Sequence, residues 1–346
     1  MGEGRNIDGA HYVVGALANI SLGGYLSTLK HMFPEHLLRL GRWLLETGYR
    51  FVTVTPTTHA RVVARMLERP AASLQDVFGW SRPFLPSLLP PAALDLLAAA
   101  GALEQQAGLM RSKVRFSTLD ERIFVHSAYP TTQPEAVFFG PDTYRFAALI
   151  KRTLDVQPKK EIGCIVDIGC GSGAGGIVAA LALGLPPPRL ILTDINPAAL
   201  CCARANAALA NLPRTTFVQG DLFSDVAETV DIILANPPYL LDQDARAYRH
   251  GGGARGSDLS LRIVIEGLPH LAAGGTLILY TGAPVVAGKD TFLESVMPAL
   301  RHADVAWDYA EIDPDVFGEE LDNPAYVDVD RIAAVALVVR KASSEA

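Results

Sequence analysis

The sequence lacks any uninterrupted apolar run of about 18 residues, the length that a helix needs to cross a bilayer. Its first residues show neither the basic region nor the small-residue cleavage pattern of a signal peptide. Cysteine is scarce, and the four cysteines form no C-x-x-C pair, so neither a disulfide framework nor a cysteine-based metal site is indicated. We therefore expect a cytoplasmic protein with reduced cysteines, no bound metal and no membrane segment.

The sequence also lacks an excess of positive charge. Its 30 Lys and Arg residues are outnumbered by 37 Asp and Glu residues, which gives a net charge of −7. Proteins that bind nucleic acids usually present a basic face to phosphate, so this balance disfavours a nucleic acid partner. Local basic clusters at residues 111–115 and 159–160 keep transfer RNA and ribosomal RNA open as alternatives.

Length and composition allow a large core. With 346 residues, of which 49% are hydrophobic, the chain can form one large α/β domain and a smaller one. No repeat with a period of 20 to 50 residues is visible, which argues against a solenoid.

A glycine-rich stretch connects a buried strand to a helix. Residues 164–168 form a short apolar run typical of a buried strand, and glycines dominate residues 169–176 before an apolar helix begins. Glycine allows the backbone to approach a ligand closely, and the start of a helix presents unpaired N–H groups. A second apolar run ends at Asp194, about 20 residues after the loop, where a carboxylate can hold a ribose diol.

These features predict a nucleoside cofactor, but they do not identify it. Gly171, Gly173 and Gly176 also satisfy the dinucleotide pattern G-x-G-x-x-G, so a nicotinamide enzyme is one interpretation.

The tetrapeptide Asn-Pro-Pro-Tyr at residues 236–239 closes a third apolar run, residues 231–235. Two prolines cannot continue a strand, so they predict a turn at its carboxyl end, where open α/β sheets bind ligands. The Asn236 amide and a free backbone carbonyl at Pro237 can accept N–H groups, and the Tyr239 ring can face a developing cation. Alone, this stretch would also fit a structural turn with a packed tyrosine. Since hydride transfer needs no such turn, it favours chemistry at a nitrogen nucleophile.

In this order the motifs resemble the class I S-adenosylmethionine-dependent methyltransferases. Within them the chain is similar to the amino-methylating branch that includes the release factor glutamine methyltransferases and the N6-adenine enzymes. The similarity spans residues 135–340 and includes Gly-Asp-Leu-Phe at residues 220–223. It implies an α/β fold: a Rossmann-like, seven-stranded methyltransferase sheet with a smaller N-terminal helical or winged-helix-like domain.

The same resemblance implies the reaction and the roles of residues. S-adenosylmethionine would be the co-substrate, and the acceptor would be an amine or amide nitrogen of a small molecule or a protein. Asn236 and Pro237 would orient the nucleophile, while Tyr239 would stabilise charge on the transferred methyl group. The glycine loop would hold the methionine part of the co-substrate, Asp194 the ribose and Asp221 the adenine amino group.

A further fragment, Pro-Asp-Thr at residues 141–143, resembles the segment that precedes the first strand in the glutamine-methylating enzymes. This resemblance places Thr143 and Tyr144 near the sulfonium, although Asp142 would serve equally well to start a helix. The predicted co-substrate-binding residues are Thr143, Tyr144, Asp167, Gly169, Gly171, Gly173, Asp194, Asn196, Asp221, Leu222 and Asn236.

The chain is expected to divide near residue 130. Helices that open at prolines (34–47, 56–67 and 90–100) and a β-hairpin of residues 114–118 and 122–126 predict an accessory domain over residues 31–130. The co-substrate-binding catalytic domain would span residues 131–346. Residues 1–30 form an apolar, glycine-punctuated segment, which fits either a lid or a helix packed across the domain junction.

Two other reactions remain open on the same fold. If the pocket admitted no acceptor, the α-amine of S-adenosylmethionine could attack its own side-chain carbon and release methylthioadenosine. That reaction would resemble the azetidine-2-carboxylate synthases. The second alternative is methylation of an RNA base. An acidic loop at residues 313–322 could attract a cationic substrate, or it could simply be a solvated loop.

Overall fold

A computed structural model of the chain describes residues 32–66, 69–156, 161–184, 186–242 and 249–343. The segment 1–30, for which a lid was one interpretation, lies outside the described residues. No helix within these segments is both long and apolar enough to cross a membrane.

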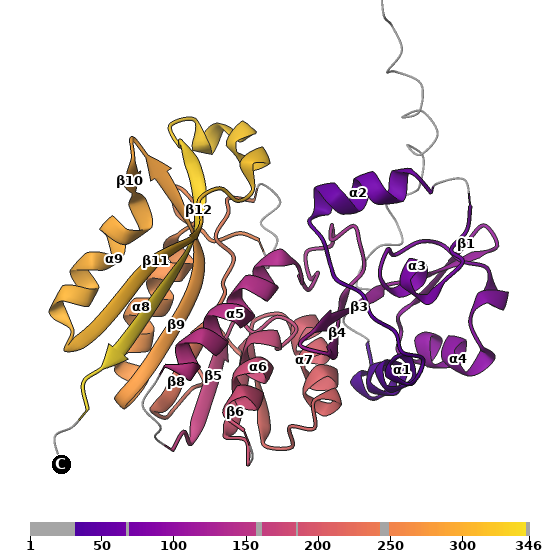
Figure 1. The fold of residues 1–346 in the computed structure, drawn as a ribbon, viewed down its shortest axis with the longest axis horizontal. Helices are drawn as coiled ribbons and strands as arrows, with labels where there is room; N and C mark the ends of the chain where they lie inside the picture. Colours follow the sequence, from indigo (N-terminus) through magenta and orange to yellow (C-terminus); the bar gives the residue numbers. More distant parts are fainter. Residues whose placement is uncertain (1–31, 67–68, 157–160, 185, 243–248, 344–346) are drawn as a thin grey trace, which may run out of the picture.

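One mixed sheet dominates the molecule (Figure 1). Its strand order is β11-β12-β9-β8-β5-β6-β7, and the short β10 pairs with β9. The five strands from β7 to β9 are parallel, whereas β12 runs antiparallel to both of its neighbours. The predicted seven-stranded methyltransferase sheet is thereby confirmed. The strands are β5 (Cys164–Ile168), β6 (Arg189–Asp194), β7 (Thr215–Gln219), β8 (Val230–Ala235), β9 (Leu271–Val286), β10 (Lys289–Asp290), β11 (Val305–Asp313) and β12 (Arg331–Lys341).

Helices cover both faces of this sheet. One face packs against α5, α6 and α7, and the other packs against α8 and α9. In β5, Ile165 belongs to the first of these hydrophobic cores and Val166 to the second. Burial on both faces explains why the central strands read as continuous apolar runs. The helices are α5 (Pro141–Asp155), α6 (Ala174–Ala182), α7 (Pro197–Leu209), α8 (Asp258–His270) and α9 (Thr291–His302).

The residues before α5 form a separate cluster of helices and hairpins on one side of the sheet (Figure 1). The three expected helices and the hairpin of β3 with β4 are present, but a short helix, α3, and a first hairpin of β1 with β2 had not been predicted. The elements are α1 (Pro34–Glu46), α2 (Pro56–Ala64), α3 (Leu74–Phe78), η1 (Pro86–Leu88), α4 (Pro91–Ala99), β1 (Leu103–Gln106), β2 (Leu109–Ser112), β3 (Val114–Leu119) and β4 (Arg122–Ser127).

Helix α7 joins this N-terminal cluster to the sheet. Its residues Ala198, Ala199, Cys202 and Ala205 belong to the same hydrophobic core as the buried side chains of α1, α3 and α4. The amide of Asn206, also on α7, completes the junction, because its Oδ1 accepts from the Val125 N–H at 2.7 Å. Its Nδ2 donates to the carbonyls of Val125 at 3.0 Å and Ser172 at 2.9 Å. One buried side chain therefore ties strand β4 and the glycine loop to α7.

We expect Asn206→Ala to lower the free energy of unfolding by about 2–4 kcal/mol, because it leaves buried backbone groups unpaired. Urea denaturation followed by circular dichroism measures this change. Lys151→Ala is the matched control, since it breaks only an exposed ion pair with Asp120 and should change stability by less than about 1 kcal/mol. Equal stabilities of the two variants would contradict the assigned role of Asn206.

Candidate active site

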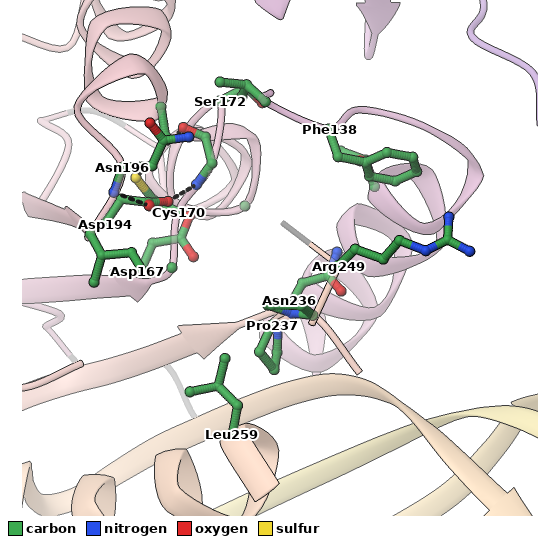
Figure 2. A pocket seen from close by; sticks show the side chains of 18 of the residues that line it. Phe138, Asp167, Cys170, Ser172, Asp194, Asn196, Asn236, Pro237, Arg249 and Leu259 are labelled. Carbon is green, nitrogen blue, oxygen red and sulfur yellow. Dashed lines mark hydrogen bonds between the residues drawn. The ribbon is translucent and has the colours of Figure 1, made fainter. Parts of the chain in front are cut away.

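A cavity opens at the carboxyl ends of β5, β6 and β8 (Figure 2). Most residues predicted from the sequence to hold the co-substrate or the acceptor line it, although they come from segments far apart in the chain. These residues are Thr143, Asp167, Gly169, Gly171, Asp194, Asn196, Asp221, Leu222, Asn236, Pro237 and Tyr239.

Two residues of the predicted site lie outside the cavity lining. Gly173 is the N-cap of α6 at φ 77°, where an added Cβ would meet Leu192 at 3.0 Å. The hydroxyl of Tyr144 instead accepts from the Thr53 N–H at 3.1 Å, and its ring packs edge-on against Phe139. Gly173 thus shapes the turn into α6, and Tyr144 contacts the N-terminal cluster.

The glycine loop is open to the cavity where the backbone requires glycine. Gly169 and Gly171 have φ values of 63° and 54°, which side chains rarely tolerate. A Cβ added at either residue would meet no atom within 4 Å, so a ligand can approach the backbone there. The loop is held by Asp194, whose Oδ2 accepts from the Gly171 N–H at 2.8 Å (Figure 2).

Asp194 is placed to receive a diol. Its Oδ1 accepts from the Asn196 N–H at 2.9 Å, so each carboxylate oxygen has one backbone partner and a lone pair left over. Burial raises the pKa of Asp194, although the two backbone N–H groups partly oppose that shift. The side chain of Asn196 caps α7 and also donates to the Glu135 carbonyl, which fixes the loop after β6.

Asp167 lies beneath the glycine loop. Its Oδ2 accepts from the Gly176 N–H at 2.7 Å, and only 2% of the residue is exposed. Burial raises the pKa of Asp167 to about 7, with a smaller contribution from the nearby Asp194. A cationic group bound above the loop would favour the ionised form of this carboxylate.

The part of the cavity that lies between Ile195 and Leu222 is suited to a flat aromatic group. Leu222 and Ile195 offer apolar walls, and Asp221 lies at the rim, where it forms an ion pair with Arg262 at 3.0 Å. Together with Asp194 and the open glycine loop, these residues fit S-adenosylmethionine. That molecule would bring a methyl group on a sulfonium to the cavity.

Asn236 lies between this region and a second end of the cavity, where Phe138 and Arg249 lie (Figure 2). Asn236 lines the cavity, and no residue of the described segments forms a hydrogen bond with its side-chain amide. Arg249 forms ion pairs with Glu320 and with Asp242, the latter at 3.5 Å. The second end therefore carries a cation that two carboxylates already neutralise.

The acidic segment after β11 contributes to this second end. It contains η2 (Gly318–Asp322) and η3 (Pro324–Tyr326), and its Phe317 lines the cavity. The Tyr326 hydroxyl accepts from the Leu241 N–H at 2.8 Å, so the segment is fastened to the chain that follows the Asn-Pro-Pro-Tyr turn. The predicted acidic loop is thus part of the cavity wall.

Several lining residues had no signal in the sequence. Phe138, Arg249 and Leu259 belong to no motif, and only the fold brings them to the cavity. Cys170 also lines it, but burial raises the pKa of its thiol well above the usual value, which disfavours the nucleophilic thiolate. All four cysteines are free.

The sequence is similar to known methyltransferases. Residues 146–286 match the methyltransferase small domain family. The release factor glutamine methyltransferase of Moorella thermoacetica is 31% identical over 279 residues, 72% of this chain and 91% of that protein. The enzyme of the same name from Deinococcus radiodurans is 32% identical over 185 residues, 50% of this chain and 61% of that protein. The ribosomal RNA small subunit methyltransferase C of Erwinia tasmaniensis is 31% identical over 121 residues, 35% of this chain and 32% of that protein.

The chain therefore belongs to the family of S-adenosylmethionine-dependent methyltransferases that contains the release factor glutamine methyltransferases. The resemblance inferred from the motifs is confirmed, as are the enzyme class and S-adenosylmethionine as co-substrate.

The raised pKa of Asp167 predicts a pH dependence of stability. Because this pKa is about 7 in the folded chain and near 3.8 when unfolded, the contribution of Asp167 is present below pH 4 and is lost as pH rises through 7. In the ligand-free protein Asp167→Asn should remove this loss, which is of order 2–4 kcal/mol. Thermal unfolding at pH 5 and pH 8 should show the variant gaining stability relative to the wild type at the higher pH. A difference between the two proteins that does not vary with pH would refute this assignment.

Proposed function

We propose that this protein transfers the methyl group of S-adenosylmethionine to a side-chain amide nitrogen of a protein acceptor. The observation that supports this most directly is the position of Asn236 and Pro237. They follow β8 and line the same cavity as the glycine loop and Asp194. Relatives named release factor glutamine methyltransferases make a release factor the first acceptor to test.

The residues of the cavity suit an amide acceptor. An amide nitrogen is a poor nucleophile because its lone pair is delocalised into the carbonyl. If the Asn236 side-chain oxygen and the Pro237 carbonyl accept its two N–H groups, they hold the nitrogen in line with the methyl group and favour the form with a free lone pair. Tyr239 would then offer the face of its ring to the positive charge on the transferred methyl group.

The charges at the acceptor end agree with a neutral side chain. Arg249 is already paired with two carboxylates, and the neighbouring segment carries several further acidic residues. A phosphate backbone would be repelled at this mouth, whereas a neutral amide on a peptide would not. This argument favours a protein over an RNA acceptor.

Product analysis tests the proposal. Purified protein is incubated with S-adenosylmethionine carrying a labelled methyl group, once with a purified release factor and once alone. We expect S-adenosylhomocysteine only when the release factor is present, and peptide mass spectrometry should place one labelled methyl group on a glutamine. Methylthioadenosine from S-adenosylmethionine alone, or transfer to RNA but not to protein, would overturn the proposal.

Asn236→Ala should lower turnover by about 100-fold or more, because it removes one of the two acceptors that hold the nucleophile. S-adenosylmethionine binding, measured by calorimetry, should be largely retained. Asn211→Gly is the matched control, since Asn211 is exposed and has a φ of 56° that glycine also adopts. Unchanged turnover in Asn236→Ala would exclude the assigned role.

A further inference from the structure

The ring of Tyr239 is held from a distant part of the chain. Tyr239 is 5% exposed, and its hydroxyl donates to Oδ2 of Asp142 at 2.8 Å. The two residues are 97 positions apart in the sequence. Asp142 is at the start of α5, immediately before Thr143, and both residues line the cavity.

Asp142 is the centre of a buried hydrogen-bond network. Its Oδ1 accepts from the Tyr280 hydroxyl at 2.8 Å and from Arg145 Nη1 at 3.0 Å. Arg145 Nη2 also donates to Asp313 at 2.8 Å, so the network reaches from α5 to the end of β11. Both oxygens of Asp142 therefore act as acceptors, for two phenol hydroxyls and a guanidinium.

Helix α5 begins at Pro141 with Asp142 in its first turn, so the interpretation of Asp142 as a residue that starts a helix is confirmed. A carboxylate in the first turn can stabilise a helix by accepting from its free backbone N–H groups. Within the described part of the chain, however, no backbone N–H donates to the Asp142 carboxylate. The capping contact comes from Thr143, whose Oγ1 accepts from the Gly140 N–H at 3.2 Å.

Packing restricts the ring on its other sides. A Cβ added to Gly282 on β9 would lie 2.1 Å from Cδ2 of Tyr239 and 2.5 Å from its Cε2, so the ring lies directly against that backbone. Phe317 packs edge-on at a centroid distance of 6.0 Å. The glycine at position 282 is thus explained by the space that the ring needs.

We propose that Asp142 is a positioning residue that fixes the ring of Tyr239, and through it the turn of residues 236–239, with Gly282 providing the space. This inference rests on the proposed function for its effect on turnover. Asp142 also lines the cavity, but both of its oxygens already accept from donors of the protein. It sets the angle at which Tyr239 and the preceding Asn236 meet the acceptor.

Kinetic measurements separate positioning from simple destabilisation. Asp142→Ala should lower kcat by about 100-fold, because the turn loses its alignment, while the S-adenosylmethionine dissociation constant changes little. Asp142→Asn keeps the size and one acceptor oxygen, so it should recover part of the lost kcat. Asp120→Ala is the control. It removes an exposed carboxylate between β3 and β4 that pairs with Lys151 of α5, the helix that carries Asp142, and it should leave kcat unchanged.

A double variant tests whether Asp142 acts through Tyr239. Tyr239→Phe keeps the ring but removes the donor, and the combined Asp142→Ala and Tyr239→Phe variant should be no slower than Asp142→Ala alone. If the loss of kcat in the double variant equals the product of the losses in the two single variants, Asp142 acts by another route and the inference is overturned.

A spectroscopic readout needs no acceptor. With 3-fluorotyrosine incorporated at position 239, the wild-type protein bound to S-adenosylmethionine should give one narrow fluorine resonance. Asp142→Ala and Gly282→Ala should shift or broaden it, while Asp120→Ala should not. An unchanged resonance in both variants would refute the positioning role even where methyl transfer is observed. If the resonance shifts in these variants but the wild-type protein transfers no methyl group to a release factor, the proposed acceptor is wrong and the positioning role of Asp142 still holds.

Discussion

The site depends on the reversal of strand order around β5. From β5 the chain continues through α6 to β6 and through α7 to β7, with these helices on one face of the sheet. It then returns to β8 on the other side of β5, and the later helices α8 and α9 cover the opposite face. Neighbouring loops therefore leave the sheet in opposite directions and open a crevice at the carboxyl ends of the strands.

Three carboxylates organise that crevice, each in a different way. Asp194 accepts from backbone N–H groups on both sides and so fixes two loops, yet each of its oxygens keeps a lone pair. Asp167 is buried, with its pKa raised to about 7, which makes its charge sensitive to what binds above it. Asp142 also lines the cavity, and its oxygens accept from two tyrosine hydroxyls, one of them that of Tyr239, and from a guanidinium. In the proposed reaction the same functional group would thus serve binding, charge balance and alignment, according to its partners.

The N-terminal cluster is coupled to the catalytic sheet by both packing and hydrogen bonds. The core that it shares with α7 is apolar, while Asn206 supplies the polar contacts to β4 and the glycine loop. Tyr144 makes a second connection, because its hydroxyl accepts from the Thr53 N–H. A rearrangement of this cluster that moves Asn206 would therefore also break its hydrogen bond to the glycine loop, which lines the cavity. The division near residue 130 remains a prediction from the sequence.

The sequence alone determined the elements and the chemistry of the loops, because these depend on local patterns. Apolar runs ending in Asp167-Ile168, Asp194 and Ala235 predicted the strands that surround the cavity, and the glycines and prolines that follow predicted where their turns would be. Only the tertiary structure decided which side chains meet. Tyr144, next to Thr143, turns toward Thr53, whereas Phe138 and Arg249 reach the cavity without any motif. The contact of Asp142 with Tyr239 spans 97 residues, and no local pattern specifies it, because it exists only once α5 packs against the sheet.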